Sequence, residues 1–213
     1  MDDTRRAVAA EQVLWSVPET ERAGRPLLVL LHGHGMDERM GVELYDHLPA
    51  ELVLASIRGP LRVLSGYGWY PLNASLGLNQ IDEAARSVLA WVREQPRHMS
   101  VGILGFSQGS SIALQCMRLA PDQFDYGVVL SGFAVPMAVA GDEALAARRP
   151  PVFSGRGDSD PLIPLPLVTM TDSWLAQHAE VTQRVYPGLG HNVSAAEIDD
   201  LAAFLRDRVA SPT

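Results

Sequence analysis

Val101-Gly-Ile-Leu-Gly-Phe-Ser-Gln-Gly-Ser-Ser111 is the stretch of this sequence that says most about the fold. An apolar run, typical of a buried strand, leads directly into a G-x-S-x-G motif centred on Ser107. The chain must turn sharply from strand to helix there, which places the serine in a strained conformation. Glycines at 105 and 109 relieve the crowding at such a turn. The pattern therefore predicts an exposed serine hydroxyl beside the N–H groups and positive dipole of a helix start.

Short apolar runs alternate with amphipathic stretches on both sides of this motif, which predicts β-α units and a mostly parallel central sheet with helices on both faces. The predicted strands are Val13–Val17, Leu27–Leu31, Leu52–Ile57, Val101–Leu104, Tyr126–Leu130, Pro151–Ser154 and Val181–Tyr186. The predicted helices are Ile81–Glu94, Ser107–Leu119, Leu165–His178 and Ser194–Val209. The last helix opens on a capping-box pattern, Ser194-Ala-Ala-Glu197. Two segments, 58–79 and 132–150, match no element, and neither is long enough to form a large cap domain.

Length and composition set limits on the classes of protein to consider. The 213 residues predict a single domain, 1–213. The formal net charge of -8 would repel nucleic acids and anionic lipid headgroups, so we expect neither as a partner. The one cysteine, Cys116, excludes an internal disulfide and suits a reducing compartment. The pair Arg5-Arg6 precedes no apolar stretch of an export signal and no run of 18 apolar residues exists, so we expect a cytoplasmic protein without integral membrane segments.

A serine nucleophile requires a base, because its hydroxyl is unreactive alone. The candidates are the six histidines His32, His34, His47, His98, His178 and His191. His191 lies in a glycine-rich loop between the last predicted strand and the last predicted helix. When a serine nucleophile lies at a strand-to-helix turn of this kind, the catalytic base comes last in the sequence, on such a loop. The orienting acid is expected between serine and histidine in sequence, and both Asp158 and Asp160 in Gly157-Asp-Ser-Asp-Pro161 qualify.

Stabilisation of an oxyanion requires backbone N–H donors. Residues 31–37, Leu-His-Gly-His-Gly-Met-Asp, follow an apolar run, and their glycines allow the loop to turn its N–H groups toward the serine. We predict that the N–H groups of His34 and Gln108 form the oxyanion hole and that His32 braces the loop. A metal site at His32 and His34 is the alternative, but no cysteine or carboxylate set accompanies them, so no metal is expected.

Four segments together resemble the phospholipase/carboxylesterase family of α/β-hydrolases, which includes acyl-protein thioesterases. They are residues 31–37, Gly105-Phe-Ser-Gln-Gly-Ser110, Gly157-Asp-Ser-Asp-Pro-Leu-Ile-Pro164 and Gly188-Leu-Gly-His191. The resemblance runs from about Leu27 to Leu205. It implies an α/β-hydrolase fold, a cofactor-free enzyme with a shallow cleft, and frequent homodimers. It also selects Asp160, the aspartate before the proline, as the catalytic acid.

The sequence departs from the family in the 58–79 segment, where members tend to have Trp followed by Phe-Asp. Here Trp69 is followed by Tyr70 and Pro71. Trp69, Tyr70 and Met36 are the predicted substrate-pocket residues, with core packing as the alternative for Trp69. The departure bears on the length of the acyl chain and leaves the chemistry unchanged.

The residues and the resemblance together predict a serine hydrolase that cleaves small carboxylic esters through Ser107, His191 and Asp160 and an acyl-enzyme. The alternative substrates are thioesters of acylated proteins and lysophospholipids. A binding protein that keeps the hydrolase fold is the non-enzymatic alternative, because a fold does not fix a function.

Overall fold

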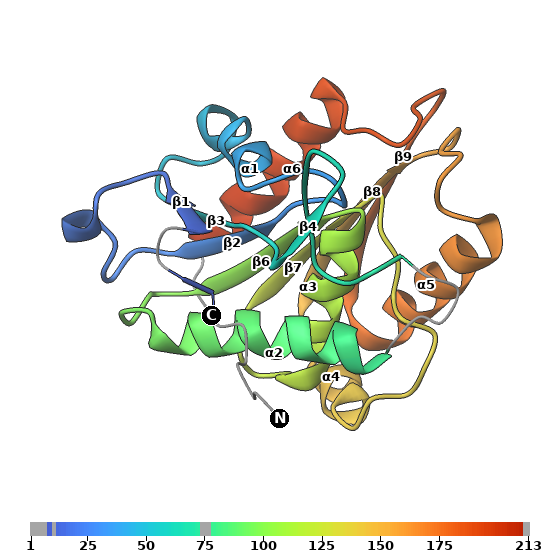
Figure 1. Cartoon of the computed structure of the whole chain (residues 1–213), viewed down its shortest axis with the longest axis horizontal. Helices are drawn as coiled ribbons and strands as arrows, with labels where there is room; N and C mark the ends of the chain where they lie inside the picture. Colours follow the sequence, from blue (N-terminus) through green and yellow to red (C-terminus); the bar gives the residue numbers. More distant parts are fainter. Residues whose placement is uncertain (1–7, 10–11, 73–77, 211–213) are drawn as a thin grey trace.

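The computed structural model describes residues 8–9, 12–72 and 78–210. The Arg5-Arg6 pair and residues 73–77 of the 58–79 segment lie outside these ranges. Figure 1 shows a twisted sheet in the middle of the molecule with helices packed on both of its faces. This arrangement confirms the α/β-hydrolase fold that the sequence predicts.

Seven strands form the central sheet, in the order β1-β3-β2-β6-β7-β8-β9. Their bounds are β1 Val13–Trp15, β2 Leu27–Leu31, β3 Val53–Ile57, β6 Val101–Phe106, β7 Tyr126–Leu130, β8 Pro151–Gly157 and β9 Glu180–Tyr186. β1 is antiparallel to β3, and every other neighbouring pair is parallel. The carboxyl ends of β6, β8 and β9 therefore lie along one edge of the sheet, where loops from distant parts of the sequence meet.

The helices are α1 Arg39–Val42, α2 Leu78–Glu94, α3 Gln108–Leu119, α4 Asp142–Arg148, α5 Leu165–His178 and α6 Ala195–Ala210, with short 3₁₀ turns η2 Glu19–Glu21 and η3 Tyr45–His47. Side chains alternate between the two faces of each strand. On β2, Leu27 and Val29 pack into the same apolar cluster as Val88 of α2 and Ile112 of α3. Leu28 on the opposite face packs with Leu201 and Leu205 of α6. Two apolar layers thus hold the sheet between α2 and α3 on one side and α6 on the other.

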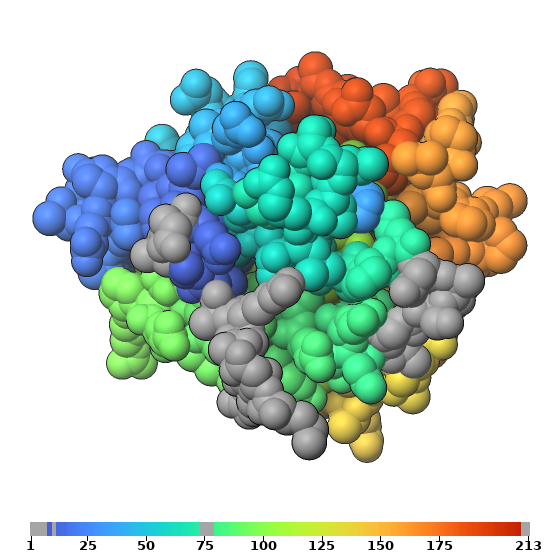
Figure 2. All heavy atoms as spheres, in the orientation of Figure 1, coloured from blue at the N-terminus to red at the C-terminus, as the bar shows by residue number. Residues whose placement is uncertain are grey.

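The two unassigned segments contain short elements. Residues 58–72 hold the hairpin β4 Leu61–Val63 and β5 Gly66–Gly68, and α4 lies within 132–150. Figure 2 shows the hairpin segment, in teal, at the surface of the molecule. Neither described segment forms a large cap domain, as expected.

A buried arginine fixes the 132–142 segment to α3. Arg118 is 1% exposed, and its Nε and Nη2 donate to the two carboxylate oxygens of Asp142 over 2.7 and 2.8 Å. The carbonyl of Val135 accepts from Nη1 at 3.0 Å, and that of Met137 accepts from Nη2. The guanidinium also lies over the Trp174 ring, 5.0 Å from its centroid. Burial of a cation is tolerated here because its donors are paired.

The start of α6 forms half of the predicted capping box. The N–H of Glu197 donates to Ser194 Oγ at 3.2 Å, but the Glu197 carboxyl turns inward and is fully buried. It lies against Gly155 of β8, where a Cβ would overlap its Oε1. Within the described residues neither carboxyl oxygen has a hydrogen-bond partner. Burial raises the pKa of Glu197 to about 7.

Candidate active site

Ser107 lies at the turn from β6 into α3, with φ of 53° and ψ of -117°. This positive φ is the strained conformation that the motif predicts for a nucleophile. The N–H of Ser107 donates to the carbonyl of Leu130 at 2.9 Å, which ties the turn to β7. A Cβ at Gly105 would overlap the backbone of Gly109, and a Cβ at Gly109 would overlap the Leu31 carbonyl. Both glycines are therefore required for the close approach of helix, strand and neighbouring strand.

The structure brings the hydroxyl of Ser107, the imidazole of His191 and the carboxylate of Asp160 into one chain of hydrogen bonds. His191 Nδ1 lies 2.6 Å from Asp160 Oδ2, and His191 Nε2 lies 2.8 Å from Ser107 Oγ. Because a carboxylate can only accept, Nδ1 carries the proton and donates to Asp160. Nε2 is then free to accept the proton of the serine hydroxyl. This is the arrangement in which an imidazole acts as a general base.

Asp160 is held in place by its own backbone turn. Its Oδ1 accepts from the N–H of Leu162 at 2.8 Å and from that of Ile163 at 3.3 Å, which leaves Oδ2 for the imidazole. The side chains of Asp160 and His191 are only 8% and 12% exposed. Partial exclusion of water strengthens this contact relative to one in bulk solvent.

Asp158, the other acid that the residues left open, performs a different task. Its Oδ1 accepts from the N–H of Gly188 at 2.7 Å and from Ser159 Oγ at 2.9 Å. The bond from Gly188 lowers the pKa of Asp158 below its usual value. Asp158 therefore ties down the backbone of the loop that carries His191, whereas Asp160 contacts the imidazole itself.

The predicted oxyanion donors lie on two segments that flank Ser107. Gly35 N–H donates to the Tyr67 carbonyl at 2.7 Å and Met36 N–H to the Gly33 carbonyl at 3.2 Å. The N–H groups of His34 and Gln108, in contrast, donate to no other described residue. Such unpaired amides at a helix start and a glycine turn are available to a ligand oxygen.

His32 braces the glycine loop, as predicted. It is fully buried, and burial lowers the pKa of its imidazole. The neutral ring donates from Nδ1 to the Gly33 carbonyl at 2.7 Å and accepts at Nε2 from the Gly59 N–H at 2.9 Å. Both ring nitrogens are thus occupied by backbone groups. No cluster of three or more potential metal ligands occurs within the described part of the chain.

The three predicted pocket residues differ in exposure. Trp69 and Tyr70 are 3% and 1% exposed and pack in the apolar core, whereas Met36 is 37% exposed. The Trp69 indole N–H donates to the His32 carbonyl at 2.8 Å. Of the three side chains, only Met36 offers substantial accessible surface to a substrate, and the packing of Trp69 matches the alternative stated for it.

Sequence reasoning missed the side chain of Gln108. It is 3% exposed, its Oε1 accepts from the Trp69 N–H at 2.9 Å, and its Nε2 donates to the Tyr70 carbonyl at 2.7 Å. The motif marks Gln108 for its backbone N–H only. No pattern in the sequence pairs it with residues 69 and 70, which lie 39 and 38 positions away.

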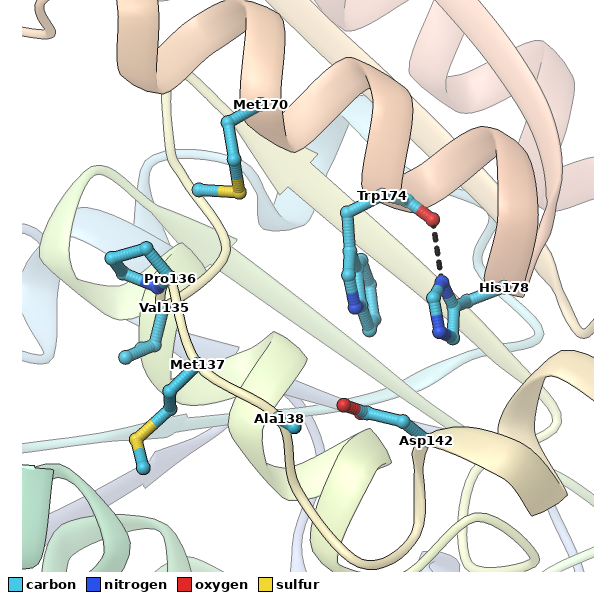
Figure 3. Close-up of a pocket in the computed structure, with 8 residues that line it drawn as sticks. All are labelled: Val135, Pro136, Met137, Ala138, Asp142, Met170, Trp174 and His178. Carbon is cyan, nitrogen blue, oxygen red and sulfur yellow. Dashed lines mark hydrogen bonds between the residues drawn. The ribbon is translucent and has the colours of Figure 1, made fainter.

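A cavity of about 350 Å³ lies between α5 and the segment that follows β7. Figure 3 shows Met170 and Trp174 projecting from α5 toward this segment, with His178 stacked beside Trp174. The residues that line it are Val135, Pro136, Met137, Ala138, Asp142, Met170, Trp174 and His178. None of them belongs to the Ser107 hydrogen-bond chain, so this cavity is separate from the candidate active site.

Comparison with known proteins places this site in context. The sequence model described as Phospholipase/Carboxylesterase matches residues 14–208. Acyl-protein thioesterase 1 of Saccharomyces cerevisiae is 27% identical over 138 residues, which cover 63% of this chain and 61% of that protein. The protein of the same name from Kluyveromyces lactis is 26% identical over 151 residues, 65% of each chain. The chain thus spans less than two thirds of the length of these relatives.

Solved structures resemble the whole of the fold. A carboxylesterase from Mesorhizobium loti superposes with a TM-score of 0.75 at 21% identity, covering 91% of this chain and 92% of that one. Esterase PE8 superposes with a TM-score of 0.74 at 25% identity, covering 91% and 97% of the two chains.

Within the part of the chain that is described, no helix is long and apolar enough to cross a bilayer.

Proposed function

Because this chain belongs to the phospholipase/carboxylesterase family, we propose that it is a serine hydrolase that cleaves small carboxylic esters through Ser107, His191 and Asp160. The observation that carries the proposal is the continuous hydrogen-bond chain, 2.8 Å from Ser107 Oγ to His191 Nε2 and 2.6 Å from His191 Nδ1 to Asp160. Three side chains from separate loops meet in the order that acyl transfer requires.

In the acylation step, His191 Nε2 takes the hydroxyl proton as Ser107 Oγ attacks the ester carbonyl carbon. The carbonyl π electrons move onto oxygen, and the N–H groups of His34 and Gln108 stabilise the resulting oxyanion. Collapse of this intermediate breaks the bond to the leaving alcohol, which receives the proton from His191. Asp160 stabilises the transient imidazolium and keeps the ring oriented.

Deacylation repeats the sequence with water as the nucleophile. A water molecule attacks the acyl carbonyl carbon while His191 removes a proton from that water. The second oxyanion forms in the same oxyanion hole. Its collapse releases the carboxylic acid and returns the proton to Ser107 Oγ. The cycle consumes one ester and one water and needs no cofactor.

Thioesters are the second class of substrate that an observation favours. Two relatives are named acyl-protein thioesterase 1, and a thiolate is a better leaving group than an alkoxide in the same cycle. Lysophospholipids are a weaker alternative, because the net charge of -8 opposes binding to an anionic interface. We further propose a homodimer, and a cytoplasmic location because the buried, free thiol of Cys116 suits a reducing compartment.

The test is labelling by a fluorophosphonate probe together with turnover of p-nitrophenyl esters of increasing chain length and one matched thioester. We expect labelling of the wild type and of Ser173→Ala, an exposed serine on α5, and none of Ser107→Ala. A folded wild type that is neither labelled nor active on any substrate would overturn the proposal and favour a binding protein. The ratio of ester to thioester turnover decides between the two substrate classes.

A further inference from the structure

The side chain of Gln108 makes a paired contact with the segment that leads out of the β4–β5 hairpin. Its amide accepts from one backbone group, the Trp69 N–H, and donates to the next, the Tyr70 carbonyl. A primary amide carries a neutral donor and a neutral acceptor side by side, so this one side chain satisfies both backbone groups. Both partners are buried, so water does not replace either bond if it is lost.

The same hairpin segment holds the glycine loop that carries His34. The Trp69 indole N–H donates to the His32 carbonyl at 2.8 Å. Gly35 N–H donates to the Tyr67 carbonyl, and Tyr67 N–H to the Met36 carbonyl, each at 2.7 Å. The backbone on both sides of His34 is therefore fixed to residues 67–69.

These contacts form a continuous path from Gln108 to His34. We propose that the Gln108 side chain is a positioning residue, which sets the distance between the two oxyanion donors, its own N–H and that of His34. The inference rests on the proposed function, because it assigns a role within that oxyanion hole. One residue thus supplies one donor through its backbone and fixes the other donor through its side chain.

Substitution of the side chain leaves the backbone donor of Gln108 in place, which makes the inference testable. Gln108→Met keeps the length of the side chain but removes both hydrogen bonds. Gln108→Glu keeps the acceptor for Trp69 N–H and sets a second acceptor against the Tyr70 carbonyl. The matched control is Gln115→Met on the same helix, since Gln115 is 1% exposed and its Nε2 donates to Asp82 Oδ1 at 2.6 Å.

The experiment measures kcat, KM and inhibition by a trifluoromethyl ketone, which forms a tetrahedral adduct with the serine. For Gln108→Met and Gln108→Glu we expect kcat to fall by about tenfold or more, because misplaced oxyanion donors lose transition-state stabilisation. KM should change less than about twofold, and the inhibition constant should rise by the same factor by which kcat/KM falls. The shape of the pH profile should be unchanged, because the Ser107–His191 contact is intact.

Several results would overturn the inference. If Gln108→Met and Gln115→Met have the same kcat and the same melting temperature, the Gln108 contact serves stability alone. A loss of kcat without weaker inhibition by the ketone, or a displaced pH profile, would place the defect in the triad. Wild-type protein that is neither active nor labelled would contradict the proposed function itself. That outcome is visible in the wild type alone, before any variant is compared.

Discussion

The imidazole Nε2 of His191 lies 2.8 Å from the Oγ of Ser107, although 84 positions of sequence separate them. The contact exists because β6 and β9 are parallel strands of one sheet and end at the same edge. Ser107 follows β6 directly, and His191 lies in the loop after β9. Asp160, after β8, completes the chain from the strand next to β9. The sheet thus converts distant motifs into neighbouring side chains.

The two aspartates of the 157–160 turn should respond very differently to substitution. Asp160→Asn replaces the acceptor of the His191 Nδ1 proton with an amide, which favours the wrong tautomer, and should lower kcat by about 10³-fold or more. Asp158→Asn keeps an oxygen that can accept from Gly188 N–H, and should lower kcat by less than about fivefold. Steady-state kinetics on a p-nitrophenyl ester measures both. Equal losses would mean that both carboxylates act on the imidazole.

Glu197 should make the protein less stable as pH rises. Burial raises the pKa of Glu197 from an unfolded value near 4.5 to about 7. The stability that the neutral side chain contributes to the folded state is therefore fully present below the unfolded pKa and is lost as the pH rises through 7. Glu197→Gln removes this loss, and should increase the free energy of unfolding by about 3 kcal/mol at pH 8 with little change at pH 5. Urea unfolding at the two pH values measures it.

The control for this prediction is Glu180→Gln, an exposed residue at the start of β9. This substitution should leave the difference in the free energy of unfolding between pH 5 and pH 8 the same as in the wild type. If Glu197→Gln destabilises the protein equally at pH 5 and pH 8, the carboxylate has a partner that the packing does not reveal.

Arg118 should be among the residues whose loss is most costly for stability. Arg118→Met removes the guanidinium donors from the Asp142 carboxylate and from the carbonyls of Val135 and Met137, and should cost about 3–5 kcal/mol. Arg39→Met breaks an ion pair with Asp37 in which the arginine is 78% exposed, and should cost less than about 1 kcal/mol. Chemical denaturation of both variants tests the contrast, which similar losses would refute.

Gly109 and Gly190 flank two candidate catalytic residues and should tolerate a methyl group unequally. A Cβ at Gly109 would overlap the Leu31 carbonyl, so Gly109→Ala should lower the free energy of unfolding by more than about 2 kcal/mol and reduce fluorophosphonate labelling. A Cβ at Gly190 meets nothing within 4 Å, so Gly190→Ala should leave stability unchanged. Thermal unfolding with parallel labelling distinguishes the two, and a stable, fully labelled Gly109→Ala would contradict the packing at the turn.

The sequence predicts the sheet well because several of its strands are continuous apolar runs. β2 and β7 have the predicted bounds, as does α5. β6 and β8 extend two and three residues beyond their predicted ends at Leu104 and Ser154. Their last residues include glycines, which favour turns in isolation. In the sheet these glycines are selected for close approach, as at Gly155, where the Glu197 carboxyl packs against the strand.

The elements that the sequence does not reveal are short or lack their usual signals. The β4–β5 hairpin turns at Leu64, which has a φ of 53° that glycine or asparagine normally adopts. α4 has only seven residues within an alanine-rich stretch that shows little periodicity. Motif order predicts Ser107, His191 and the 157–161 turn as candidates for the nucleophile, the base and the acid. The hydrogen bonds of the Gln108 side chain to Trp69 and Tyr70 and the inward turn of Glu197 depend on contacts between distant segments, so no local pattern encodes them.

The ladder between β8 and β9 pairs residue with residue from Pro151–Glu180 to Gly157–Tyr186. Asp160 and His191 follow the last residues of the two strands, Gly157 and Tyr186, at fixed offsets. A slip of one position would move one loop past the other by about 3.3 Å, more than the length of the hydrogen bond that joins the acid to the ring. Recovery of ester cleavage after dilution from denaturant would therefore report, in a simple colorimetric assay, whether these two neighbouring strands have aligned correctly.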